Sequence, residues 1–208
     1  MPPLRWGLVV PVKRLTIAKT RLSAYGDAVR QDLALAFAVD VVAAALGCEP
    51  VDAVLVVTDD ERAAAALRAA GARVVADAPD AGLNPALAYG ADLLRAESIA
   101  SVATVSADLP CVTSDDLATA LAAVQSGRRG FVPDAAGTGT TLLAAPEGLS
   151  LAPAYGAASR SGHLASGAVE LPAGRGLRLD VDTPEDLAAA LALGVGAATA
   201  AATALLFG

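Results

Sequence analysis

The sequence predicts an α/β domain in which a largely parallel β-sheet is covered by helices on both faces. Two observations favour this fold class. Short apolar runs of the kind found in buried strands alternate with longer segments of helical periodicity. The early runs are apolar at successive positions rather than at alternate ones, which is typical of parallel strands that are buried on both faces.

The first half of the chain supplies most of the expected sheet. Strands are expected at the apolar runs 8–12, 53–58, 73–76 and 101–106. Helices are expected at the periodic segments 28–46, 60–70, 84–96 and 114–125. This alternation of strands and helices indicates βαβ units, whose parallel strands are joined through helices on the faces of the sheet.

Residues 128–178 have a different composition, with short apolar runs and much of the glycine and proline. Strands are expected here at 130–133, 140–145, 168–171 and 177–181, and one short helix at 159–166. We interpret 1–208 as a single domain in which 128–178 is a strand-rich insertion that closes over one edge of the sheet. A last helix is expected after Thr183, with this residue as its cap and Pro184 at its first position.

Composition excludes several classes of protein. The 208 residues are 55% hydrophobic and 18% charged, which excludes a disordered chain. The net charge of −7 argues against a nucleic-acid partner. Cys48 and Cys111 form no CxxC pair, and no export signal is visible, so a cytoplasmic location is expected. The stretch 187–208 is too rich in Ala, Gly and Thr for a membrane span.

The loop after the first expected strand holds Lys13 and Lys19, the only two lysines among the 15 lysine and arginine residues. Arg14 and Arg21 add positive charge to it. Ligands of α/β sheets bind outside the carboxyl ends of the strands, and an ammonium group is a compact partner for phosphate. We interpret the loop as a phosphate site. The alternative is a solvated basic loop with no ligand.

A carboxylate, Asp108, follows the strand expected at 101–106. Desolvation of a carboxylate at the entrance of a binding site is unfavourable unless the carboxylate is paired with a positive group or binds a cation. Ser114 is the better cap for the next helix, which leaves Asp108 without a capping role. We therefore favour Asp108 as a metal ligand over a turn residue.

Two further carboxylates, Asp180 and Asp182, are expected on one face of the strand at 177–181, with Cα atoms ~7 Å apart. Two carboxylates at that separation repel each other unless a cation lies beside them. Thr183 already caps the next helix, so capping explains neither acid. Together with Asp108 they form a set of oxygen ligands that suits Mg²⁺.

Loops of small residues supply further candidates. Gly82 allows a ligand to approach closely, and Asn84 offers the donor and acceptor that recognition of a base or ribose needs, although a helix cap explains it equally well. The segments 134–142 and 155–159 offer hydroxyl groups and free backbone N–H groups to an anion. His163 lies within the short helix and has no partner for a catalytic triad, so we interpret it as a packing or capping residue.

Taken in order, six motifs resemble a known family. They are VPVKRLTIAKTRLS, DAPDAGLNPAL, SADLP, DAAGTGTTLL, YGAAS and LRLDVDTPEDL. The chain resembles, from about residue 8 to 191, the guanylyltransferases of coenzyme F-420 biosynthesis that act on phosphoenolpyruvate or 2-phospho-L-lactate. The resemblance implies a three-layer α/β/α nucleotidyltransferase fold, Rossmann-like and of the GT-A type, with a mixed, mostly parallel sheet.

The resemblance also implies roles for single residues. Lys13 and Lys19 would bind the phosphates of GTP and, with Asp108, form the catalytic set, while Gly82 and Asn84 would belong to the nucleotide site. Mg²⁺ would be held by Asp108, Asp180 and Asp182. The acceptor would be bound by the 128–178 insertion, through Thr141, Gly156 and Ser159.

The implied reaction joins GMP from GTP to a phosphorylated three-carbon acid and releases pyrophosphate. The product would pass to a downstream F-420 biosynthetic transferase, and a homo-oligomer is possible. Many nucleotidyltransferases carry a Gly-rich loop after the first strand, where this chain has PVKR at 11–14. This departure weakens the interpretation as a molybdenum-cofactor or sugar nucleotidyltransferase. Another nucleotidyltransferase of the same fold, a molybdenum-cofactor guanylyltransferase or a cytidylyltransferase, is the alternative. A glycosyltransferase and a non-catalytic nucleotide-binding protein also stay open as interpretations, because a fold does not fix a function.

Overall fold

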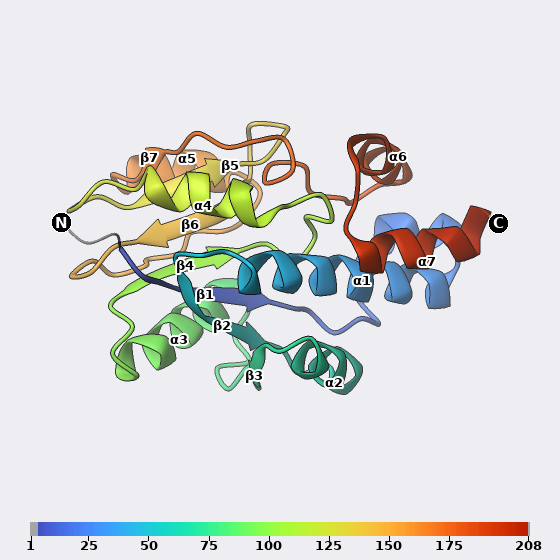
Figure 1. Ribbon diagram of the computed structural model, residues 1–208, viewed down its shortest axis with the longest axis horizontal. Helices are drawn as coiled ribbons and strands as arrows, with labels where there is room; N and C mark the ends of the chain where they lie inside the picture. The colour runs from blue at the N-terminus through green and yellow to red at the C-terminus, as the bar shows by residue number, and fades with distance from the viewer. Residues whose placement is uncertain (1–3, 208) are drawn as a thin grey trace.

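A computed structural model describes residues 4–207 of the chain, except for the side chains of Leu205 and Phe207. Its centre is a seven-stranded sheet in the order β3-β2-β1-β4-β6-β5-β7 (Figure 1). The strands are β1 (Trp6–Pro11), β2 (Val51–Val57), β3 (Arg73–Val75), β4 (Ser101–Val105), β5 (Gly130–Pro133), β6 (Thr140–Ala145) and β7 (Val169–Glu170). Strand β6 is antiparallel to β4 and β5, and the other pairings in the described sheet are parallel. The prediction of a mixed, mostly parallel sheet is confirmed.

Helices cover both faces of this sheet, in three layers. They are the 3₁₀ helix η1 (Thr20–Tyr25) and the α-helices α1 (Asp27–Leu46), α2 (Glu61–Ala69), α3 (Leu83–Ala96), α4 (Ser114–Ala122), α5 (Ser159–Ala165), α6 (Pro184–Leu193) and α7 (Ala197–Phe207). The core on one face includes residues of α1, α2 and α4, and that on the other includes residues of α3. Figure 1 shows α3 on the opposite side of the sheet from α1 and α4.

The central strands explain the near-continuous apolar runs. In β1, Leu8 and Val10 lie in the core shared with α1, whereas Val9 between them lies in the core shared with α3. Successive side chains of a strand point to opposite faces, so a strand with helices on both sides needs apolar residues at every position. All three of these side chains are fully buried.

Gly90 lets α3 lie close to the sheet. A Cβ atom at this position would lie 2.7 Å from Val9 Cγ1 and 3.1 Å from Val57 Cγ2, closer than carbon atoms normally approach. The absence of a side chain at Gly90 therefore sets the spacing between α3 and the strands that lead into the site.

The prediction of a strand at 177–181 is wrong. Residues 176–178 form a turn, in which the backbone N–H groups of Arg178 and Leu179 donate to Arg175 O. The segment then runs on without strand pairing, and Val181 N–H donates to the carbonyl oxygen of Asp108. The segment does alternate apolar and polar residues, but no strand within residues 4–207 pairs with it.

The segment 128–178 extends the main sheet rather than closing over its edge. Its strands β6, β5 and β7 continue the sheet from β4 outwards. The start of β6 thereby lies beside the end of β4, where Ser106 N–H donates to Thr141 O. This brings the second half of the chain to the edge of the sheet where β1 and β4 end.

Two helix starts test the expected caps. Thr183 caps α6 as expected, in a reciprocal pair with Asp186 at the third position. For α4 the expectation of Ser114 is wrong, because Thr113 is the cap and pairs with Asp116. The Ser114 hydroxyl instead donates to Ala44 O near the end of α1. The inference that Asp108 does not cap this helix is unaffected.

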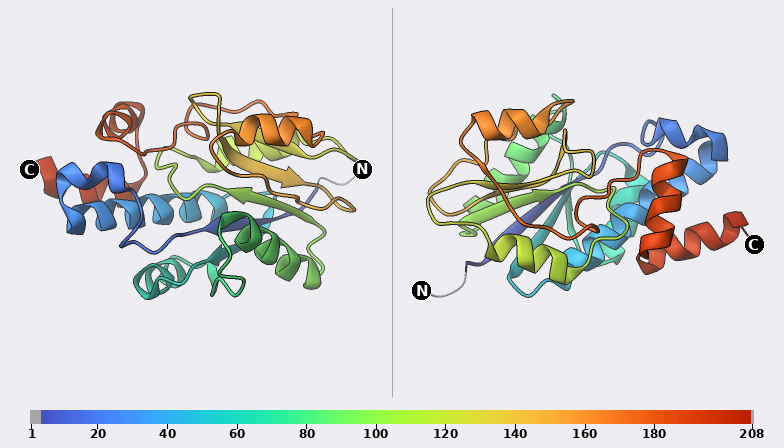
Figure 2. Two further views of the ribbon diagram at one scale, coloured as in Figure 1. Left: turned by 180° about the vertical axis from the view of Figure 1, so that it is seen from behind. Right: turned by 90° about the horizontal axis from the view of Figure 1, so that it is seen from above.

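The C-terminal helices α6 and α7 gather at one end of the molecule beside α1 (Figure 2). Asp40 of α1 accepts hydrogen bonds from the backbone N–H groups of Ala198 and Thr199, both at 2.9 Å, and so caps α7 from a neighbouring helix. None of the helices in residues 4–207 combines the length and apolar character that a bilayer span requires.

Candidate functional site

The carboxyl ends of β2, β1 and β4 meet at one edge of the sheet, because β1 pairs in parallel with both neighbours. After β1 the chain continues to β2 on one side of the β1–β4 pair, and after β4 it continues to β5 and β6 on the other side. Open α/β sheets bind ligands at such a reversal of strand order. Two adjacent cavities, of about 410 and 300 Å³, lie there. They share the lining residues Pro11, Val12, Lys13, Ile17 and Leu83.

The larger cavity is lined by Lys13 and Lys19 of the first loop and by Asp108 and Asp182. Lys19 Nζ lies 2.5 Å from Asp108 Oδ2 and 2.6 Å from Asp182 Oδ1, and its side chain is only 11% exposed. Four side chains expected to act together, from three distant parts of the sequence, thus meet at one cavity. We expected the lysines to face phosphate, but Lys19 is bound to the two carboxylates.

These contacts shift the pKa values of the paired groups. Burial alone would lower the pKa of the Lys19 ammonium, but Asp108 and Asp182 raise it above its ordinary value. Burial likewise opposes the change at Asp182, where Lys19 holds the pKa of the carboxyl below its usual range. Both groups of this pair are therefore charged at neutral pH.

Asp180 lies beside this cluster without a cation of its own. Val181 N–H donates to Asp108 O at 3.0 Å, which fixes Asp180 and Asp182 close to Asp108. Burial, with the nearby charge of Asp108, raises the pKa of Asp180 to about 6. Asp180 does not line the larger cavity. It is an acid whose charge the described residues do not compensate.

The donor set of the cluster fits a divalent cation. Asp108 Oδ1 is buried without a hydrogen-bond partner among the described residues, and the pKa of Asp180 is raised by burial and by the nearby charge of Asp108. Carboxylate oxygens are the ligands that Mg²⁺ prefers. Within residues 4–207, no three acidic, His or Cys side chains are arranged as they stand to hold a metal ion, and Lys19 lies between two of the three expected ligands. The metal site stays a prediction.

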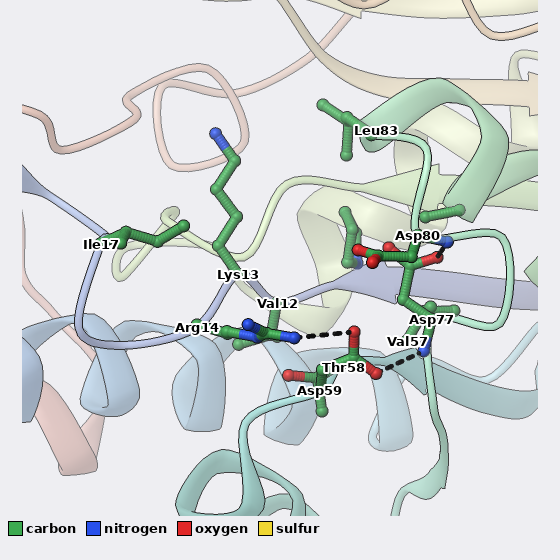
Figure 3. Close-up of a pocket in the computed structure, with 13 residues that line it drawn as sticks. Val12, Lys13, Arg14, Ile17, Val57, Thr58, Asp59, Asp77, Asp80 and Leu83 are labelled. Atoms are coloured by element: carbon green, nitrogen blue, oxygen red, sulfur yellow. Dashed lines mark hydrogen bonds and ion pairs between the residues drawn. The ribbon is translucent and has the colours of Figure 1, made fainter.

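The smaller cavity lies beyond Lys13, between the ends of β1 and β2 and the start of α3 (Figure 3). Its charged lining is mixed: Lys13 and Arg14 are basic, and Asp59, Asp77 and Asp80 are acidic. Asp59 accepts a hydrogen bond from Asp77 N–H at 3.0 Å and lies 3.7 Å from Arg14. The cavity therefore offers carboxylate acceptors beside the apolar side chains of its shared wall.

Besides the two lysines, Gly82 and Asn84 were expected at the nucleotide, and Gly82 lines this cavity. Its φ of +98° lies in the region that favours glycine, so the turn into α3 requires this residue type. The side chain of Asn84 binds the backbone of Tyr155. Its amide donates to Tyr155 O at 3.0 Å and accepts from Tyr155 N–H at 2.8 Å. It does not cap α3, which begins after Gly82, and it ties this helix to the loop before α5.

The residues expected at the acceptor lie beyond β4. Thr141 is buried, and its hydroxyl donates to Leu177 O at 2.6 Å. Ser159 is buried at the start of α5, where its N–H donates to Gly156 O. Gly156 is exposed. The loop and helix start are joined to each other, but the hydroxyl of Thr141 is already committed to the backbone of the 171–178 loop.

His163 packs in the interior, as expected. Its Nε2 accepts from Ala154 N–H at 3.0 Å, so the proton of the neutral ring is on Nδ1, which lies 2.9 Å from Thr140 Oγ1. The ring also contacts Phe131 and Tyr155. Burial lowers the pKa of His163 to about 4, which keeps the ring neutral at physiological pH.

Reasoning from sequence missed residues that shape the first loop. Asp60 caps α2 through Oδ1, and its Oδ2 accepts from Leu15 N–H at 2.8 Å. Arg30, buried on α1, contacts the same loop from the other side. The signal for Arg30 was a single arginine in line with Leu33 and Phe37 on the buried face of α1.

Comparisons with known proteins agree with this geometry. A family model described as guanylyl transferase CofC like matches residues 7–202. A phosphoenolpyruvate guanylyltransferase of Streptomyces coelicolor is 56% identical, with 98% of each chain covered. Another of that name, from Thermomonospora curvata, is 55% identical over 95% of this chain and 88% of its own.

Among solved structures, a nucleotidyl transferase from Methanothermobacter thermautotroptrophicus superposes with a TM-score of 0.64. The match covers 89% of this chain and 95% of that one, at 21% identity. At that identity the likeness extends to the fold, and the three-layer α/β nucleotidyltransferase fold implied by the sequence motifs is confirmed.

Proposed function

The chain belongs to the CofC-like family of guanylyl transferases, and from this premise we propose that it joins GMP from GTP to phosphoenolpyruvate with release of pyrophosphate. The observation that carries the proposal is Lys19, held between Asp108 and Asp182 at a cavity that Lys13 also lines. Two polyanions must meet for this reaction, and a site with mixed charges offsets their repulsion.

The two cavities suggest how the nucleotide lies. We expect the guanosine in the smaller cavity, because the Watson–Crick edge of guanine carries N1–H and N2–H₂ donors that the carboxylates of Asp77 and Asp80 can accept. The triphosphate would extend past Lys13, which lines both cavities, towards Lys19. Ile17 is 64% exposed and, with Leu83, offers apolar contact to the base or ribose.

The reaction is an in-line displacement at phosphorus. A phosphate oxygen of the acceptor forms a bond to the α-phosphorus of GTP, the bond from that phosphorus to the β-bridging oxygen breaks, and pyrophosphate leaves. The acceptor phosphate is already ionised, so no general base is needed. This agrees with the neutral, buried state of His163. We expect Lys13 and Lys19 to bind the phosphates and stabilise the charge on the leaving group.

Mg²⁺ bound by Asp108 and Asp180, with Asp182, would supply Lewis-acid stabilisation of the phosphate charge. Asp108 contributes the buried oxygen that has no partner, and Asp180 the carboxylate that lacks a compensating charge. Asp182 also binds the Lys19 ammonium group, so this carboxylate would contact both the lysine and the metal ion.

For the acceptor we expect the loop before α5 and the start of β6, near the end of β4. Gly156 is exposed there, and Ser159 and Thr141 support the surrounding backbone. The relatives are named for phosphoenolpyruvate. The alternative acceptor, 2-phospho-L-lactate, has the same carbon skeleton with a saturated C2–C3 bond. The product would pass to a transferase of F-420 biosynthesis, most simply in the cytoplasm.

A panel assay tests the proposal. Purified protein with Mg²⁺ is given GTP, CTP, ATP or UTP together with phosphoenolpyruvate or 2-phospho-L-lactate, and pyrophosphate release is followed. Because we expect the adduct to be labile, a second arm contains the downstream deazaflavin transferase and its substrate, and product is identified by mass. We expect turnover with GTP and phosphoenolpyruvate. Turnover with CTP but not with GTP would contradict the proposal.

A further inference from the structure

Arg30 is a buried cation on α1 with an exposed fraction of only 4%. Its guanidinium donates to backbone carbonyl oxygens of the loop after β1: to Leu15 O at 3.1 Å, to Thr16 O at 2.9 Å and to Ala18 O. Asp27 lies 3.2 Å away, and its side chain is 81% exposed. Most of the contacts that satisfy this buried charge are therefore backbone dipoles of one loop.

This loop carries the two lysines of the site at its ends. Between Lys13 and Lys19 the chain makes a turn in which Ile17 and Ala18 N–H groups donate to Arg14 O. Lys19 has a φ of 51°, in the left-handed region that lysine rarely adopts. A conformation of this kind persists only where its surroundings impose it.

The guanidinium group of Arg30 is suited to stabilise this conformation of the loop. Its planar fork presents five N–H donors, so one side chain can satisfy three carbonyl groups at once, whereas an ammonium group is a point charge without this geometry. Asp60 completes the support from the other side, where it accepts from Leu15 N–H at 2.8 Å. The loop is thus held by the side chains of Arg30 on α1 and of Asp60, the N-cap of α2, neither of which lines a cavity.

We propose that Arg30 is a positioning residue for the nucleotide: it holds the turn between Lys13 and Lys19 so that both ammonium groups face one cavity. The inference rests on the proposed function, in which that cavity takes the triphosphate. Arg30 lines neither cavity and acts through the backbone of residues 15–18.

A merely structural role makes a different prediction. If Arg30 only stabilised the fold, its loss would reduce the folded fraction and the apparent kcat, and the folded molecules would bind nucleotide with unchanged affinity. If it positions the loop, nucleotide affinity falls in fully folded protein and the KM for the acceptor stays nearly constant.

The experiment uses the full chain with Arg30→Met, which removes the charge and the fork, and Arg30→Lys, which keeps the charge. Arg62→Met is the matched control, because Arg62 is 54% exposed and pairs only with Asp32 among the described contacts. GTP affinity is measured by calorimetry without acceptor, and amide hydrogen exchange is measured at Ile17, Ala18 and Leu22.

We expect Arg30→Met and Arg30→Lys to weaken GTP binding by about 10- to 100-fold, since a small misplacement of binding groups has effects of that size. The three amides should exchange faster, and Arg62→Met should match the wild type. If Arg30→Met does not fold, Arg30→Lys decides the question, because it keeps the buried charge and the aliphatic stem.

Folded Arg30 variants with wild-type GTP affinity and wild-type exchange would overturn the inference, even if the enzyme turns over as proposed. Wild-type protein that binds GTP but transfers it to no acceptor would instead overturn the proposed function. In that case weaker GTP binding by Arg30→Met still supports the positioning role. Wild-type protein that binds no nucleoside triphosphate overturns both.

Discussion

Lys19 Nζ lies 2.5 Å from Asp108 Oδ2, across 89 residues of sequence, and the two side chains come from the loops after adjacent parallel strands. This pair brings the positive and negative halves of the site into direct contact. Because Lys19 also binds Asp182, any cation or phosphate that enters must share or replace these contacts.

Lys19→Met should abolish most transfer while the protein still folds. Removal of one group that stabilises transition-state charge costs about 10²–10³ in rate. The substitution also leaves Asp108 and Asp182 without their partner, which should lower the free energy of unfolding at pH 7 by about 1–3 kcal/mol, reduced from the fully buried case by the partial exposure of both acids. Single-turnover assays and urea titrations measure the two effects.

The matched control is Arg21→Met. Arg21 lies 3.7 Å from Asp182 and its side chain is 73% exposed, so its loss should change the rate and the stability little. Equal effects of the two substitutions would show that general positive charge, rather than the buried contact of Lys19, is what the site requires.

Asp108→Asn should remove the metal dependence of the reaction. Wild-type protein treated with EDTA should lose activity and regain it with Mg²⁺, whereas Asp108→Asn should stay about 10²–10³ slower at any Mg²⁺ concentration. Mn²⁺ binding, followed by paramagnetic resonance, provides a readout without turnover. Asp92→Asn, at a position 78% exposed, is the control. Unchanged Mn²⁺ affinity in Asp108→Asn would contradict the assignment of this residue as a ligand.

Asp180 should make the metal-free protein less stable at neutral than at mildly acidic pH. Its pKa is about 6 in the folded protein and 3.8 for the free side chain, so folding takes up a proton between these values. The favourable contribution is fully present below pH 3.8 and is lost as the pH rises through 6. Asp180→Asn should therefore raise the free energy of unfolding by about 1 kcal/mol at about pH 7.5, after allowance for solvent screening.

Thermal unfolding of the Asp180→Asn and wild-type proteins at several pH values, with EDTA present, measures this difference. The gain should shrink towards about pH 4.5, where wild-type Asp180 is largely protonated. A gain of the same size at both ends of the range would mean that packing, rather than charge, separates the two proteins.

Asp80→Asn should weaken the preference for guanine. Asp80 lines the smaller cavity, where a carboxylate can accept from the exocyclic amino group of guanine. Inosine triphosphate lacks that group, so it should be a poorer substrate than GTP for the wild type, with the ratio of kcat/KM values falling about 10-fold or more in the variant. If activity with GTP and with inosine triphosphate falls equally in the variant, Asp80 instead contacts a group that both nucleotides share, such as N1–H or the ribose.

The sheet and most helices followed from the sequence because their signals are local. A strand buried on both faces requires an apolar residue at every position, and β1, β2 and β4 lie at the expected runs. The segment 177–181 alternates in the same way as a half-buried strand, but strand formation also needs a neighbour to supply hydrogen bonds. The sequence contains no direct sign that Val181 bonds to Asp108 O instead.

The site could be predicted from the sequence only in part. Charged residues placed after strands were expected at one edge of the sheet, and Lys13, Lys19, Asp108 and Asp182 do line one cavity. The partners of each group could not be inferred, because they depend on side chains distant in sequence. Asn84 could equally have capped a helix or faced a base, and its amide binds the backbone of Tyr155.

Gly176→Ala should disturb the site through the loop that carries Asp180. A Cβ atom at 176 would overlap the backbone oxygen of Cys111, and backbone cannot give way as a flexible side chain can. We expect the free energy of unfolding to fall by about 1–3 kcal/mol, as for other overpacked sites. We also expect slower transfer by the molecules that remain folded, because the shift passes along the turn to Asp180 and Asp182.

The control is Gly162→Ala in α5, where the added Cβ would make an ordinary contact, 3.6 Å from Ala154 Cβ. This substitution should leave stability unchanged or raise it slightly, since alanine favours helix more than glycine does by about 1 kcal/mol. Thermal unfolding and active-site titration separate the two effects of Gly176→Ala. Full activity per folded molecule in that variant would mean that the loop absorbs the displacement before it reaches Asp180.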